Sequence, residues 1–216
     1  MTSKIRAIEM IDMMRKLYPN AHCELNHSNA FELTIAVLLS AQTTDVGVNK
    51  ITPHLFAKYK SPADYLAVPL TELENDLRAI GLYKTKAKNI KKLCELLITD
   101  YQGKIPNTYN DLIRLPGVGR KTANVVLSVW FGIPRLAVDT HVERISKRLK
   151  FVRLKDNVLE VEERLMYLLP ETMWSDAHHA MIFFGRYHCT AKQPKCLDCP
   201  LSDSCGYKNK KNKDQK

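Results

Sequence analysis

The stretch DLIRLPGVGRKTANVV, residues 111–126, decides how this chain folds. Apolar residues recur with a helical period on both sides of a short turn, LPGVG at 115–119, so we predict two helices joined by a tight hairpin. Gly117 and Gly119 allow backbone conformations that other residues resist, and the second helix begins with N–H groups that lack an internal partner. Such amides bind a phosphate without reading a base. An ordinary helical hairpin without a ligand explains the glycines equally well.

The same 3.6-residue period dominates the rest of the chain, and no stretch of more than a few residues alternates with period two. This pattern predicts an all-α protein. Residues 30–40 are apolar almost all round, which predicts a helix that is buried on most sides. A capping box from Thr71 to Glu74 is expected to open another helix. Further helices are expected at residues 3–17, 85–101, 140–149, 157–169 and 176–185.

The composition is that of a globular protein with an anionic partner. The 216 residues carry a formal charge of +10 and are 45% hydrophobic, which excludes intrinsic disorder. The longest apolar stretch is too short to span a membrane, and the N-terminus has no signal-peptide pattern, so we expect a cytoplasmic protein. The surplus of positive charge points to nucleic acid or an acidic membrane surface, although solubility alone accounts for many such surpluses. Residues 208–216 form a basic tail.

Four of the six cysteines fall in one short segment, while Cys23 and Cys94 stand alone. Because Cys94 lies in an apolar predicted helix, we expect it in the core. Disulfides are not expected without an export signal. Four thiolates suit either a structural zinc ion or a [4Fe–4S] cluster. The uneven spacing, with a single Cys-x2-Cys pair, fits a loop around a cluster better than a zinc ribbon, and zinc stays the alternative. The four cysteines are Cys189, Cys196, Cys199 and Cys205.

The loop between the first two of these cysteines carries Lys192 and Lys195. A metal centre that pushes this loop outward would present both lysines to phosphates. A solvated loop with no partner is an equally good interpretation of the same residues.

Two further residues at helix starts have both a chemical and a structural interpretation. Lys121 lies in the first turn of the second hairpin helix, where we expect the helix dipole and partial burial to disfavour the ammonium and expose a nucleophilic amine. A lysine that simply reaches a phosphate is the alternative. Asp139 stands immediately before a predicted helix, a position at which aspartate usually serves as an N-cap.

Taken together and in this order, the motifs resemble those of the endonuclease III family, which are DNA glycosylases and abasic-site lyases of the helix-hairpin-helix superfamily. The resemblance covers residues 20–206, and no motif departs from the family pattern. The motifs are LSAQTTD at 39–45, GLYK at 81–84, LPGVGRK at 115–121, VDTHV at 138–142 and the loop of four cysteines at 189–205.

The resemblance implies two helical domains with DNA in a cleft between them. Residues 23–133 would form a six-helix domain with the hairpin at about 108–131, and residues 1–22 would pack with 134–216 to form the cluster domain. It favours a [4Fe–4S] cluster on the four cysteines over zinc. It also implies a monomer whose partner is double-stranded DNA with damaged pyrimidines or abasic sites. If the cell is bacterial, the protein is expected at the nucleoid.

The family pattern assigns a role to each motif residue. Lys121 would be the nucleophile and Asp139 the catalytic carboxylate. The residues expected to contact DNA are Gln42 and Leu82, which would replace the flipped nucleotide, and Leu115, Gly117, Val118, Gly119, Lys192 and Lys195.

The implied activity is excision of oxidised pyrimidines in base excision repair, followed by strand cleavage through a lysine Schiff base. Two other functions compete with it: a non-catalytic iron–sulfur protein that binds DNA, and a zinc-stabilised nucleic-acid module.

Overall fold

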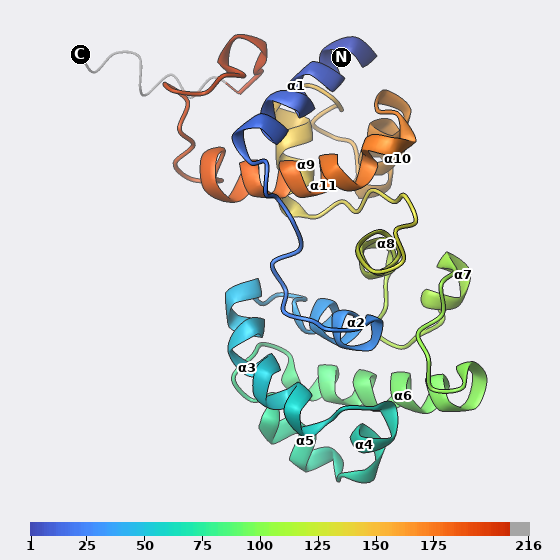
Figure 1. Cartoon of the computed structure of the whole chain (residues 1–216). Coiled ribbons are helices and arrows are strands. Elements are labelled where there is room, and N and C mark those ends of the chain that lie inside the picture. The colour runs from blue at the N-terminus through green and yellow to red at the C-terminus, as the bar shows by residue number, and fades with distance from the viewer. Residues whose placement is uncertain (208–216) are drawn as a thin grey trace. The chain divides into compact units, whose positions relative to one another are not determined.

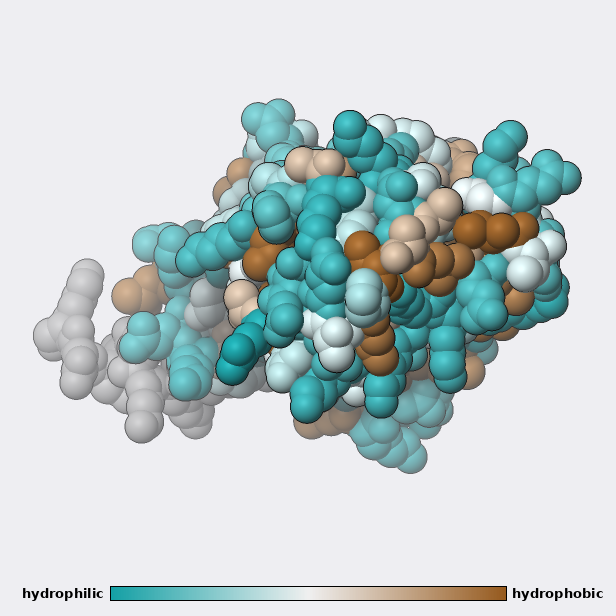
Figure 2. All heavy atoms as spheres, turned by 90° about the horizontal axis from the view of Figure 1, so that it is seen from below, coloured by the Kyte–Doolittle hydropathy of each residue, from teal (hydrophilic) through white to brown (hydrophobic). Residues whose placement is uncertain are grey.

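The computed structural model describes residues 1–207, so the predicted basic tail at 208–216 lies outside the described residues. Every regular element within residues 1–207 is a helix (Figure 1), which confirms the all-α prediction. None of the described helices is both long enough and apolar enough to cross a membrane. Figure 2 shows a face on which hydrophilic side chains dominate and hydrophobic ones form small, separate patches.

The chain divides into two compact units, which we describe separately. The hairpin unit spans Glu24–Ile133, and the cysteine unit combines Met1–Cys23 with the chain from Pro134 onward. The hairpin unit contains α2 (Ala30–Leu39), α3 (Asp45–Lys58), α4 (Pro62–Ala67), α5 (Leu70–Asp76), α6 (Tyr83–Tyr101), α7 (Tyr109–Leu112) and α8 (Arg120–Val129).

Helix α2 is the centre of the hairpin unit. Seven of its ten residues are buried, and it packs against α3, α6 and α8. The prediction of a helix buried on most sides is therefore confirmed. Helix α6 also packs against α4 and α5. Cys94 in α6 is fully buried, as predicted, and burial raises the pKa of its thiol to about 12.

The cysteine unit is built around four packed helices and the turn that leads to the cysteines. Helix α1 packs against α10 and α11, and α9 packs against α10, α11 and η2. Figure 1 shows α1, the first helix of the chain, lying beside α11. The unit contains α1 (Lys4–Leu17), α9 (Thr140–Arg148), α10 (Val158–Leu168), the 3-10 turn η1 (Glu171–Met173), α11 (Trp174–Phe183), the π-helical turn η2 (Phe184–His188) and the 3-10 turn η3 (Ser202–Ser204).

One local expectation is wrong, and one helix was not predicted. Thr71 is not an N-cap, because α5 already begins at Leu70, after Pro69. The capping box of this region lies earlier, where Ser61 and Asp64 bond reciprocally at the start of α4. Helix α3 has no counterpart among the predicted helices, since it contains Pro53, a residue that usually interrupts a helix.

Candidate functional site

The hairpin turn leaves only part of its backbone available to a ligand. The N–H of Val118 donates to the carbonyl of Leu115 at 3.0 Å, and the N–H of Leu115 donates to the carbonyl of Leu112 at 3.1 Å. The side chains of Leu115 and Val118 are buried, so neither side chain is exposed to a partner. Gly117 and Gly119 are exposed, and their N–H groups have no partner among the described residues. A phosphate would therefore meet the glycine amides rather than all four predicted residues.

The two glycines of the hairpin are required for different reasons. Gly117 has φ +82°, and a Cβ there would lie 2.8 Å from Cδ1 of Leu38 in α2. A glycine is needed at position 117 both for the turn and for close packing on α2. Gly119 has ordinary backbone angles, and a Cβ there would meet no atom within 4 Å. Its lack of a side chain leaves the start of α8 open.

Lys121 is the second residue of α8, which confirms its predicted place in the first turn. No side chain caps this helix, so its first amides and its positive end are left without a side-chain partner in the turn that carries Lys121. The predicted partial burial of Lys121 is wrong, because its side chain is exposed and the buried part of α8 begins at Thr122.

Asp139 is the N-cap of α9, as its position predicted. Its Oδ1 accepts hydrogen bonds from the N–H groups of His141 and Val142, each at 2.8 Å. Its Oδ2 accepts none from the residues that the structure describes. Burial lowers the pKa of the neighbouring His141, whose Nδ1 lies 3.1 Å from the guanidinium of Arg144. The cap fixes the carboxylate while one oxygen stays available for chemistry.

Gln42 and Leu82 share an unusual backbone conformation. Gln42 has φ 54° and Leu82 has φ 58°, in the left-handed region that costs a residue other than glycine about 1–2 kcal/mol. Both side chains are exposed, Leu82 by 53%, so Leu82 is not a packing residue. The two turns lie side by side, because a Cβ on Gly81 would be only 3.6 Å from the carbonyl oxygen of Gln42. Strained, exposed residues in adjacent turns are typical of a functional surface.

The four clustered cysteines follow the π-helical turn η2. All four are half-buried and free of disulfides. Burial raises the pKa of the Cys199 and Cys205 thiols, and other cysteines of the segment raise it further.

The donor set fits an iron–sulfur cluster. Four cysteine thiols that form no disulfide lie in one loop, and four thiolates are the ligands that a [4Fe–4S] cluster requires.

Two arginines of α9 hold the cysteine loop, and neither was predictable from sequence patterns. Arg148 is buried and donates to Sγ of Cys189 at 3.1 Å and to the carbonyls of Thr190 and Ala191 at 2.8 and 3.1 Å. Arg144 donates to the carbonyl of Gly185 in η2 at 2.7 Å and to the carbonyl of Cys189, where the loop begins, at 3.3 Å. The helix that Asp139 caps thus also fastens the loop.

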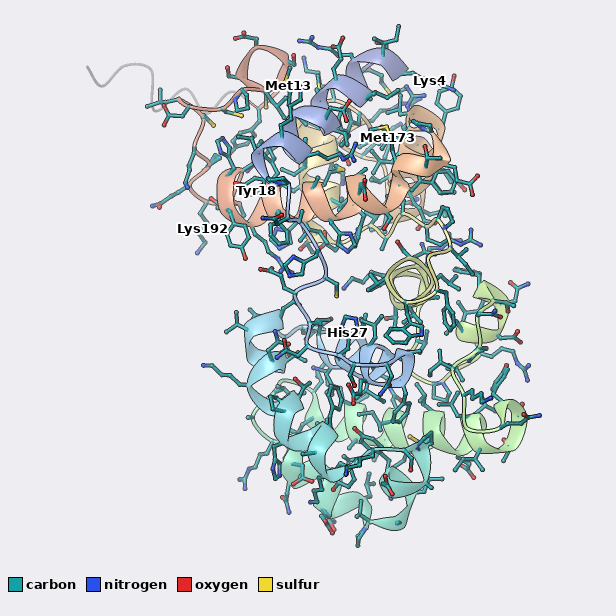
Figure 3. The ribbon with its side chains drawn as sticks, in the orientation of Figure 1. Lys4, Met13, Tyr18, His27, Met173 and Lys192 are labelled. Carbon is teal, nitrogen blue, oxygen red and sulfur yellow. The ribbon has the colours of Figure 1, made fainter. Side chains whose placement is uncertain are left out.

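Lys192 and Lys195 are both exposed on this loop. Figure 3 shows Lys192 pointing away from the helices of the cysteine unit. The structure therefore presents both lysines to solvent, as either interpretation of the loop required.

Comparison with known proteins decides the family. Residues 35–171 match the model of the HhH-GPD superfamily base excision DNA repair proteins, and residues 189–205, from the first clustered cysteine to the last, match the iron-sulfur binding domain of endonuclease III. Endonuclease III of Bacillus subtilis is 58% identical over 94% of this chain and 93% of its own length. The chain belongs to the endonuclease III family.

Other members of the endonuclease III family agree. The Escherichia coli K12 enzyme is 45% identical over 96% of this chain and 98% of its own length. A solved structure of a trapped endonuclease III-DNA covalent intermediate is 59% identical, with a TM-score of 0.94 over 95% of this chain and 97% of that one. The predicted resemblance, the DNA partner and the iron–sulfur cofactor are thereby confirmed. The chain is a DNA glycosylase/lyase of base excision repair, and neither the non-catalytic binder nor the zinc module describes it.

The two hairpin glycines provide a matched test of the phosphate site. Gly117→Ala should lower the free energy of unfolding by about 2–4 kcal/mol, because it adds left-handed strain and a clash with Leu38. Gly119→Ala should leave stability unchanged but weaken DNA binding about tenfold, because its methyl group obstructs the amides. Urea unfolding and fluorescence anisotropy measure the two effects. Wild-type DNA affinity in Gly119→Ala would show that the hairpin does not hold a phosphate.

Proposed function

We propose that the chain excises oxidised pyrimidines from duplex DNA and that Lys121 and Asp139 carry out the chemistry. The observation that carries the proposal is the exposed amine of Lys121 in the uncapped first turn of α8. A relative 59% identical to this chain forms a covalent intermediate with DNA. Among side chains, a lysine amine can join the sugar carbon as a Schiff base, and this linkage makes strand cleavage possible.

The first step brings the damaged nucleotide out of the helix. Its extrusion costs a few kcal/mol, and less for a poorly stacked lesion. Leu82 fits the role of an apolar wedge in the vacated stack, since it is exposed and held in a strained turn. Gln42, in the adjacent turn, would face the unpaired base with its amide.

The second step removes the base. The neutral amine of Lys121 attacks C1′ of the sugar, and the base leaves with the electrons of the glycosidic bond and takes up a proton. The free Oδ2 of Asp139 would stabilise the positive charge that develops on the sugar and accept a proton from the attacking amine. The fixed geometry of the capped carboxylate suits this task, because no reorganisation is needed during the reaction.

The third step cleaves the strand. The nitrogen lone pair then opens the sugar ring, the ring oxygen takes up a proton, and a protonated Schiff base remains between Lys121 and C1′. Its iminium acidifies the proton on C2′, and loss of that proton expels the 3′-phosphate by β-elimination. Water then hydrolyses the Schiff base and returns the free lysine.

The remaining predicted residues would hold the DNA backbone. The amides of Gly117 and Gly119 and the ammonium groups of Lys192 and Lys195 suit phosphates and read no base. Cys189, Cys196, Cys199 and Cys205 would ligate the [4Fe–4S] cluster, which when bound cross-links the loop that carries both lysines. We further propose that the protein acts as a monomer in the cytoplasm, at the nucleoid of a bacterial cell.

Strand cleavage tests the role of Lys121. On duplexes with thymine glycol or an abasic site, wild type should release the base and cleave 3′ to the lesion. Lys121→Ala and Lys121→Arg should both lose cleavage, and Lys121→Arg should keep DNA affinity because it retains the positive charge. Gel analysis and anisotropy measure these outcomes. Cleavage by Lys121→Arg at the wild-type rate would rule out an amine nucleophile at this position.

The two functions of Asp139 can be separated by substitution. Asparagine caps a helix as well as aspartate, so Asp139→Asn should retain wild-type stability, whereas Asp139→Ala should lose about 1 kcal/mol. Both variants should slow base excision by about 100-fold, because the charge is gone. Urea unfolding and single-turnover excision report the two effects. Rapid excision by Asp139→Asn would limit the residue to its capping role.

A further inference from the structure

A lysine that the mechanism does not use lies buried beneath the turns of Gln42 and Leu82. Lys86, in the first turns of α6, is only 3% exposed. Its ammonium donates to the carbonyl of Leu39 at 2.8 Å and to Oγ1 of Thr43 at 3.0 Å. No other lysine within residues 1–207 is buried.

Burial of Lys86 disfavours the charged form of its amine. Burial lowers the pKa of Lys86, and no carboxylate accepts a hydrogen bond from it within residues 1–207. Partial compensation comes from the last residue of α2, because Leu39 supplies a carbonyl at the negative end of that helix. An apolar side chain of similar length would fill the same space without this desolvation, so core packing alone does not account for a lysine.

The contacts of Lys86 reach both strained turns. Its side chain binds Leu39 and Thr43, which precede and follow Gln42. Its backbone N–H makes the ordinary helical hydrogen bond to the carbonyl of Leu82, four residues earlier, at 3.0 Å, so Lys86 lies one turn after the wedge residue. Left-handed residues of this kind persist only where their surroundings hold them. One residue therefore connects the turn that carries the wedge with the turn that carries the amide.

We propose that Lys86 is a positioning residue that holds Gln42 and Leu82 in register, so that the two side chains together replace an extruded nucleotide. The proposal rests on the roles of these two residues in the proposed function. It assigns Lys86 to the extrusion step and not to the covalent chemistry at Lys121.

This assignment predicts a selective defect in Lys86→Met. Excision of thymine glycol requires the base to be flipped and should slow about tenfold, since a small misplacement of positioning groups has effects of this size or larger. Cleavage at an abasic site should change less than about twofold, because that nucleotide is extruded at little cost. A general loss of folded protein would reduce both rates by the same factor.

Lys91→Met is the matched control. Lys91 lies on the same helix and also donates to backbone carbonyls, those of Leu66 and Val68 at the end of α4, away from both turns. Its substitution should leave both reactions at the wild-type rate. Thr43→Val removes one acceptor of the Lys86 ammonium without emptying the core, and it should show a smaller defect with the same selectivity.

A double-mutant cycle identifies the route of the effect. Combining Lys86→Met with Gln42→Ala should slow thymine glycol excision no further than Gln42→Ala alone, since the side chain of Lys86 holds the turn of Gln42. Three results would each overturn the proposal. The first is an equal loss of both reactions in Lys86→Met and in Thr43→Val. The others are full additivity in the cycle and excision at the wild-type rate by Lys86→Met. Failure of the wild-type protein to excise thymine glycol would instead refute the proposed function.

Discussion

The first amides of an α-helix have no partner within the helix, and the way each helix start satisfies them governs the candidate site. At α9 the carboxylate of Asp139 binds two of these amides, which fixes its position. At α8 the N-cap is Gly119, and no side chain serves as a cap. The amides and positive end of α8 therefore remain available to a phosphate beside Lys121. Leu82 occupies the corresponding position at the start of α6.

Buried cations that bind backbone carbonyls hold the segments around these helix starts. In the cysteine unit, Arg148 fastens the loop that begins at Cys189. In the hairpin unit, Lys86 fastens the turn of Gln42. Carbonyl groups in irregular loops lack the regular partners of helices, and a buried cation satisfies several of them at once. This arrangement keeps exposed loops ordered without requiring regular structure in them.

Features encoded over a few neighbouring residues were predictable from the sequence. The apolar run of α2 predicted its burial, and the glycines predicted the hairpin. The cysteine spacing favoured a cluster, while the interpretation of Leu82 as a wedge came only from the family resemblance. The buried cations were not predictable, because Arg148 and Lys86 bind residues about 40 or more positions away. The exposure of Lys121 was missed because a helical period does not show where the burial of α8 begins.

Borohydride trapping tests the central claim, that the amine of Lys121 bonds to the sugar, most directly. Borohydride reduces the Schiff base to a stable amine, so the enzyme remains attached to a duplex that carries thymine glycol. Digestion and mass spectrometry of the adduct then identify the residue that carries the sugar. The account predicts that the adduct forms in high yield and lies on Lys121. An adduct on another residue, or strand cleavage without any trapped adduct, would contradict it.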